Sequence, residues 1–168
     1  EFIKKKKIHI KINISDERKL LLDTGGGIFK GTEPFNENPF IVINPDTIWN
    51  NGYLDELNKL EKIFFKENKS SLLLVKKDNS FDTSFKGDFN LSDNFVSRDL
   101  ENEFIFTGAQ ILNRKIFQSV NKKIFSMNAI WDILIQKRNL IGIESHQKFY
   151  HVNTKHTYDQ ILKLKSID

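Results

Sequence analysis

The sequence predicts an α/β domain whose sheet has an antiparallel part. In the first half of the 168 residues, apolar runs typical of strands alternate with apolar residues at helical spacing, and shorter strand patterns gather in the second half. No internal repeat, low-complexity tract or linker divides the chain. We therefore expect a single domain over residues 1–168, long enough to bury a sizeable core.

The first predicted elements lie around a glycine-rich segment. Isoleucines alternate with polar residues over residues 8–14, which predicts a half-buried strand. Thr24 precedes three glycines as the expected N-cap of a short helix over about residues 26–32, which ends before Pro34. The continuous apolar run of residues 40–43 is typical of a strand covered on both faces, as in a parallel sheet.

Helix and strand patterns continue through the rest of the chain. Apolar residues recur at helical spacing over residues 54–64, which predicts a helix of about 15 residues. Strands are expected over residues 72–75, around 87–89, and over 104–112, 141–143 and 149–152.

Two late helices follow from capping residues and apolar spacing. Apolar residues follow Met127 at i+3, i+4, i+7 and i+8, with Ser126 as the expected cap. Trp131 lies on this apolar face, so we expect it in the core rather than as a platform for a ligand. Thr154 is expected to cap a final helix. The inner face of that helix is expected to hold Tyr158, Ile161 and Leu162.

Composition narrows the classes of function. The net charge of +4, from 26 basic and 22 acidic residues, is weak evidence for nucleic acid binding. The lysines at residues 4–7 are expected to be a solvated strand entry, and an RNA-binding domain would need an aromatic strand pattern that the sequence lacks. The absence of cysteine excludes disulfides, zinc–thiolate sites and thiol nucleophiles. No apolar run is long enough to cross a bilayer and no signal peptide is visible, so we expect no membrane partner and a cytoplasmic location.

Residues 24–27 (Thr-Gly-Gly-Gly) form the first candidate site. Free backbone N–H groups at a helix N-terminus bind anions, and glycine lets a ligand approach the backbone closely. Neither the Walker pattern nor G-x-G-x-x-G is present, so an ordinary helix-entry turn remains the alternative.

Asp46 is the second candidate, and His151 is the third. Asp46 follows the apolar run of residues 40–43 and should lie at the carboxyl end of a strand, the edge at which open α/β sheets bind ligands. A carboxylate there can hold Mg²⁺, which takes few protein ligands, whereas the alternative is an Asx turn without a ligand. His151 lies in a predicted strand, where a histidine without partners is usually structural.

Six blocks follow one another over nearly the whole chain: residues 22–30, 39–46, 86–89, 106–112, 125–132 and 149–154. In content and order these blocks resemble the sugar-1-phosphate nucleotidyltransferase family, in which the first two read much like E-T-G-G-G-I-x-K and P-F-hydrophobic-N-G-D. The nearest likeness is to the branch of N-acetylmuramate-1-phosphate uridylyltransferases and mannose-1-phosphate guanylyltransferase-like proteins. The resemblance implies a Rossmann-like three-layer αβα fold and a part in the synthesis of NDP-sugars, including those of the cell wall.

The resemblance also implies a reaction and a role for each candidate residue. An oxygen of a sugar 1-phosphate attacks the α-phosphorus of a nucleoside triphosphate, pyrophosphate leaves, and Mg²⁺ is the cofactor. Asp46 would be the principal metal ligand and catalytic residue, with His151 at the position of the second ligand. The nucleotide would lie along Thr24, Gly25 and Gly26. The sugar phosphate would face Asp88 and Gly108.

Three departures from the family pattern are visible. The family's N-terminal G-x-G-T-R-M-x-P loop, which grips the triphosphate, is absent from these 168 residues. The late D-V-G-T motif is replaced by residues 151–154 (His-Val-Asn-Thr), and imidazole is a poorer Mg²⁺ ligand than carboxylate. The N-G-D motif has become Asn44-Pro45-Asp46, and proline removes one N–H and restricts the residue before it.

The missing loop leads to further expectations about the chain. By the resemblance, the segment that binds the triphosphate, including the first strands, would precede residue 1, so we expect no nucleotidyl transfer by these residues alone. Residues 40–43 would lack a partner on one side. Because unpaired apolar edges recruit other chains, we expect the chain to self-associate or to pair with a missing N-terminal segment. A non-catalytic sugar-nucleotide-binding or regulatory module is the alternative function.

Overall fold

The computed structural model describes residues 10–35, 39–118 and 120–164. The helices are α2 (Asp23–Gly31), α3 (Tyr53–Glu67), α4 (Met127–Gln136) and α5 (Lys155–Ile161), with 3₁₀ turns at Lys77–Asn79 and Arg114–Phe117. The strands are β1 (Phe40–Ile43), β2 (Ser70–Lys76), β3 (Asn90–Ser92), β4 (Phe95–Ser97), β5 (Phe104–Leu112) and β6 (Leu140–Ser145).

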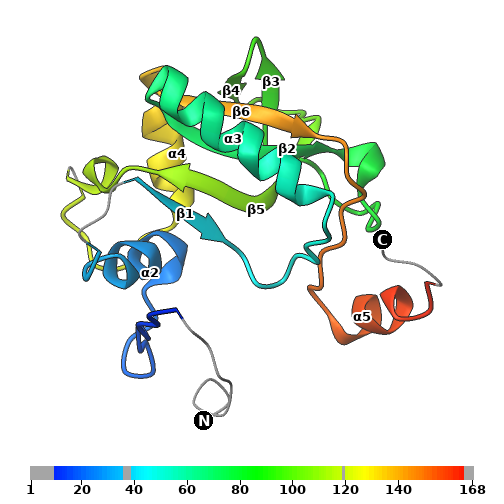
Figure 1. The fold of residues 1–168 in the computed structure, drawn as a ribbon, viewed down its shortest axis with the longest axis horizontal. Coiled ribbons are helices and arrows are strands. Elements are labelled where there is room, and N and C mark those ends of the chain that lie inside the picture. Colours follow the sequence, from blue (N-terminus) through cyan, green and yellow to red (C-terminus); the bar gives the residue numbers. More distant parts are fainter. Residues whose placement is uncertain (1–9, 36–38, 119, 165–168) are drawn as a thin grey trace.

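These elements form three layers, with a mixed sheet as the middle one. The six strands lie in the order β1-β5-β2-β6-β4-β3, with β2 parallel to β6 and antiparallel to β5. Helix α3 packs on one face of the sheet, and α2 and α4 pack on the other (Figure 1). The predicted α/β sheet with an antiparallel part is therefore confirmed. Within the described residues, every helix is too short or too polar to cross a membrane.

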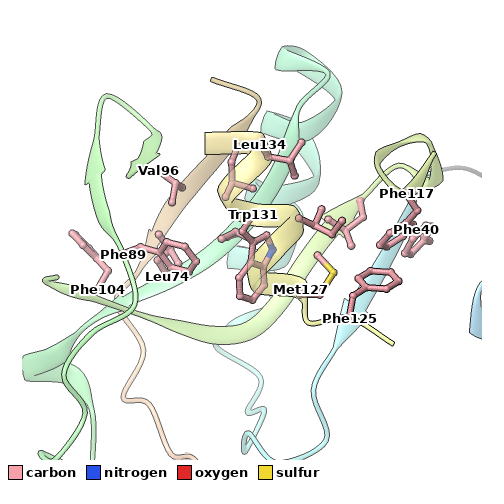
Figure 2. Close-up of a cluster of buried hydrophobic side chains, with 14 residues drawn as sticks. Phe40, Leu74, Phe89, Val96, Phe104, Phe117, Phe125, Met127, Trp131 and Leu134 are labelled. Atoms are coloured by element: carbon pink, nitrogen blue, oxygen red, sulfur yellow. The ribbon is translucent and has the colours of Figure 1, made fainter. Parts of the chain in front are cut away.

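Strand β2 is the centre of the core because side chains alternate along it. Leu72 and Leu74 pack with α4 in one hydrophobic cluster (Figure 2), whereas Leu73 packs with α3 in another, and all three are fully buried. Trp131 of α4 belongs to the first cluster, and its indole N–H donates to Gln110 Oε1 at 3.1 Å. The prediction that Trp131 is a core residue is confirmed.

Both late helices begin as the sequence predicts. The Ser126 hydroxyl accepts a hydrogen bond from the backbone of α4, and the Thr154 hydroxyl accepts one from the backbone of α5. The predicted inner face of α5 is only partly right, because Ile161 is buried whereas Tyr158 and Leu162 are 46% and 61% exposed. This short helix contacts the rest of the chain along one row of side chains spaced four residues apart, Thr157 and Ile161.

Two predicted strands are absent from the part of the chain that the structure describes. Residues 10–14 form no strand, and Ile10 and Ile14 are 73% and 76% exposed, because an alternating pattern becomes a strand only where another strand bonds to it. The lysines at 4–7 and Ile8 lie outside the described residues. Residues 149–152 form only isolated bridges.

Helix α2 begins at Asp23, three residues before the predicted start, and Thr24 lies inside it rather than at its cap. The Thr24 hydroxyl accepts a hydrogen bond from the backbone N–H of Met127, at 3.0 Å, at the start of α4. Thr24 therefore joins two helices and does not cap its own.

Strand β1 is at the edge of the sheet, so the prediction that it is covered on both faces is wrong. It pairs with β5 in antiparallel register, and Ile41 and Ile43 are 47% and 45% exposed. Helix α3 covers β2, β5 and β6 and leaves the same face of β1 open. Asp46 follows three residues after the end of this edge strand, at Ile43.

Candidate functional site

The backbone around Asp46 is fixed by strand β5 and by the segment before α5. The Asn44 N–H donates to Gly108 O at 2.9 Å, and the Thr47 hydroxyl donates to Thr107 O at 2.7 Å. Thr47 also forms an antiparallel bridge with His151, beside which the Val152 N–H donates to Asp46 O at 2.7 Å. Asp46 thus lies after the carboxyl end of β1, as predicted.

The structure brings Asp46 and His151 together across this bridge. His151 Nε2 lies 3.2 Å from Asp46 Oδ2, and the two side chains are 22% and 45% exposed. The other polar atom of each side chain, Asp46 Oδ1 and His151 Nδ1, is buried without a hydrogen-bond partner. Residues 105 positions apart in the sequence therefore form one polar pair with two unsatisfied atoms.

Aromatic rings hold the imidazole of His151 in place. The Phe149 ring stacks on it at a centroid distance of 6.0 Å, and the Phe85 ring meets it edge-on at 5.6 Å. A further carboxylate, Asp82, lies near it. The pKa of Asp82 is lowered chiefly by hydrogen bonds from Ser84, with smaller contributions from Asn153 and from the charge of His151.

The residues at this site fit a divalent cation held by one carboxylate. Among the described residues no group of three or more His, Cys, Asp or Glu side chains is arranged to hold a metal. Mg²⁺ needs only one or two carboxylates when phosphate oxygens and water complete its shell, and the unpartnered Asp46 Oδ1 is an oxygen that a cation would satisfy. The nitrogen of His151 is the weaker match, because Mg²⁺ prefers oxygen ligands.

Gly108 lies within β5, and Asp88 lies beside this strand in the segment before β3. Asp88 Oδ2 accepts a hydrogen bond from the backbone N–H of Phe106 at 2.9 Å. Gly108 has a φ of +97°, and a Cβ at this position would lie 2.7 Å from Asn44 Cβ. Gly108 is therefore required where β5 meets the segment that leads to Asp46.

The glycines of α2 have a packing role. A Cβ on Gly25 would lie 2.5 Å from the Phe125 ring, and one on Gly26 would lie 2.4 Å from the carbonyl oxygen of Lys123. The Gly26 N–H donates to Phe125 O at 3.0 Å. The structure thus joins Thr24, Gly25 and Gly26 to the start of α4 and the segment before it, rather than to the pair of Asp46 and His151.

Arg98 is a partly buried connection that the sequence does not reveal. Its guanidinium bonds to Asp132 at 2.6 Å and to Asn128 at 2.5 Å, both on α4, and lies 4.4 Å from the centre of the Phe89 ring. Its Nε donates to the backbone oxygen of Asp88 at 3.2 Å. These partners are distant in the sequence, so no local pattern marks Arg98, yet it ties the Asp88 segment to α4.

A cavity of about 1010 Å³ lies elsewhere, beside α2. Its lining combines apolar side chains such as Phe29 and Val120 with several basic ones, and does not include Asp46 or His151. We place the candidate site at the Asp46 pair, because unsatisfied polar atoms indicate a ligand more specifically than volume does.

No family model and no curated protein matches the sequence. Solved structures do match. HddC from Yersinia pseudotuberculosis complexed with GMP-PN is 23% identical, with a TM-score of 0.66 over 94% of this chain and 68% of its own. The inositol-1-phosphate CTP transferase from T. maritima is 13% identical, with a TM-score of 0.63 over 81% of this chain and 58% of its own.

A UDP-glucose pyrophosphorylase from Acinetobacter baumannii is 12% identical, with a TM-score of 0.67 over 84% of this chain and 55% of its own. The chain thus spans less than two thirds of the transferase and of the pyrophosphorylase. At these identities the likeness establishes the fold: the chain has the Rossmann-like α/β fold of sugar-phosphate nucleotidyltransferases, as the sequence predicts.

Proposed function

We propose that this chain is the sugar-phosphate-binding part of a nucleotidyltransferase that transfers a nucleoside monophosphate to a sugar 1-phosphate. The observation that supports this most is the Asp46 carboxylate, placed after the carboxyl end of β1 with one oxygen buried and unpartnered. The fold is shared with proteins named as an inositol-1-phosphate CTP transferase and a UDP-glucose pyrophosphorylase. Such chemistry depends on positioning and on charge neutralisation.

In the proposed reaction an oxygen of the sugar 1-phosphate forms a bond to the α-phosphorus, and the bond to pyrophosphate breaks. A bound Mg²⁺ supplies neutralisation of phosphoryl charge, and Asp46 is the residue that would hold it. Asp88, which precedes β3, and Gly108 of β5 would face the sugar phosphate, and the nucleotide would lie along Thr24, Gly25 and Gly26 at the start of α2.

Calorimetric titration of the 168-residue chain with UDP-glucose and with GDP-mannose tests this proposal. We expect at least one of them to bind with a Kd below about 1 mM in Mg²⁺ and about tenfold more weakly in EDTA, because the cation links Asp46 to the phosphates. Binding that EDTA leaves unchanged, or the absence of binding to a chain that is folded by circular dichroism, would contradict the proposal.

A non-catalytic sugar-nucleotide-binding or regulatory module is the second candidate, favoured by His151 at the position of a second carboxylate. To separate the two functions, the chain is extended at its N-terminus by a segment with a G-x-G-T-R-M-x-P loop, and pyrophosphate release from a nucleoside triphosphate is measured. Release by the extended chain supports the transferase, whereas binding without release supports the module.

We also propose that the chain self-associates through the edge of β1. This strand pairs only with β5 among the described residues, and its Ile41 and Ile43 are exposed. Light scattering at micromolar concentration should therefore detect a dimer or larger species, and Ile41→Lys should shift it to monomer, because a charge on an edge strand opposes pairing. Leu162→Lys, at the exposed C-cap of α5, is the control. A monomeric wild-type chain would contradict this prediction.

A further inference from the structure

We propose that His151 orients the Asp46 carboxylate through a hydrogen bond and is not itself a ligand of the cation. This inference rests on the proposed function, in which Asp46 holds a divalent cation. It assigns His151 a positioning role in place of the second-ligand role that the sequence resemblance implies.

The two imidazole nitrogens of His151 have different surroundings. Nε2 lies 3.2 Å from Asp46 Oδ2, within reach of a hydrogen bond, and we assign it as the nitrogen that donates to the carboxylate. Nδ1 is buried and has no hydrogen-bond partner, and the Phe149 and Phe85 rings pack against the same imidazole. Ligation of a cation through Nε2 would require Nε2 to give up its contact with Asp46 Oδ2.

The second argument is the rigidity of the pair. The bridge between Thr47 and His151 and the hydrogen bond from Val152 N to Asp46 O fix the two backbone segments against each other. A hydrogen bond from His151 to Oδ2 would restrict rotation of the carboxylate, and Oδ1 is the oxygen left without a partner. Hydrogen bonds to a ligating carboxylate are the usual means by which a protein fixes a metal ligand.

The third argument is ligand chemistry. A cation bound among phosphates prefers oxygen ligands, and one carboxylate is enough when phosphate oxygens and water complete its shell. An imidazole that donates to the carboxylate strengthens the site without entering the coordination shell.

The test uses Mn²⁺ as the probe. It is bound to the 168-residue chain together with UDP-glucose or GDP-mannose, whichever of the two binds. Electron spin-echo spectroscopy of the wild-type chain, with and without ¹⁵N-labelled histidine, reports whether a histidine nitrogen is bonded to Mn²⁺. We expect no directly bonded nitrogen. A directly bonded nitrogen that is lost in His151→Gln would overturn the inference and leave the proposed function standing.

The second readout is the affinity for Mn²⁺, measured from the electron paramagnetic resonance signal of the Mn²⁺ that stays unbound. We expect His151→Phe, which keeps a ring but loses the donor, to weaken binding about tenfold, and His151→Gln, which keeps an N–H donor, to stay within about threefold of wild type. His146→Phe is the matched control, because the His146 side chain is 76% exposed. Equal losses in the Gln and Phe variants would overturn the inference. Absence of Mn²⁺ binding to a folded wild-type chain would overturn both this inference and the proposed function.

Discussion

Replacement of Gly26 by Ala is expected to destabilise the fold by about 1–3 kcal/mol, although alanine is the better helix former. A Cβ on Gly26 would lie 2.4 Å from the carbonyl oxygen of Lys123 and 3.0 Å from Leu22 Cβ, so the backbone of one segment must move. That movement would also strain the hydrogen bond from Gly26 N to Phe125 O. Urea unfolding followed by circular dichroism measures the change.

Gly27→Ala is the matched control in the same helix. A Cβ on Gly27 would meet only the carboxylate of Glu17, at 3.0 Å, and this side chain can shift by a few tenths of an ångström while its Oε2 keeps the hydrogen bond from the Leu22 N–H. We therefore expect Gly27→Ala to leave stability unchanged or to raise it by up to about 1 kcal/mol through helix propensity. Equal effects of the two substitutions would contradict the packing role given to Gly26.

Asp46→Asn is expected to weaken Mg²⁺-dependent binding of a nucleotide sugar about 100-fold, or about 2.7 kcal/mol. The substitution keeps the shape of the side chain but removes the charge that would hold the cation, and among the described residues no three-ligand group is present to replace it. The measurement is the calorimetric titration in Mg²⁺ and in EDTA, together with circular dichroism to verify folding.

Asp159→Asn, on the exposed side of α5, is the control for this substitution and should bind as the wild-type chain does. If Asp46→Asn bound the nucleotide sugar with wild-type affinity in Mg²⁺, Asp46 would not be a metal ligand.

The elements that the sequence predicts correctly are those whose signals are local. The apolar spacing of α3, the caps of α4 and α5 and the continuous apolar run of β2 each depend on neighbouring residues. The position of Asp46 after the end of β1 follows for the same reason, because the end of an apolar run is visible in the chain itself.

The features that the sequence misplaces depend on tertiary partners. The alternating isoleucines of residues 10–14 have the pattern of a strand, but the structure places no strand beside them. The exposure of β1 depends on where α3 lies, and the early start of α2 depends on contacts with Phe125 and Met127. The sequence does not predict the role of Arg98, because its ion-pair partner, Asp132, is 34 residues away. The pairing of Asp46 with His151 was expected from a family resemblance and not from any local pattern.

A crystal structure of the chain with Mn²⁺ and a bound nucleotide sugar tests directly whether Asp46 holds a divalent cation. Anomalous scattering locates Mn²⁺ independently of the protein atoms. We expect Mn²⁺ at coordination distance from an Asp46 carboxylate oxygen, with phosphate oxygens in the same coordination shell. If Mn²⁺ bound elsewhere, with the Asp46 carboxylate outside its coordination shell, Asp46 would not be the ligand of the cation.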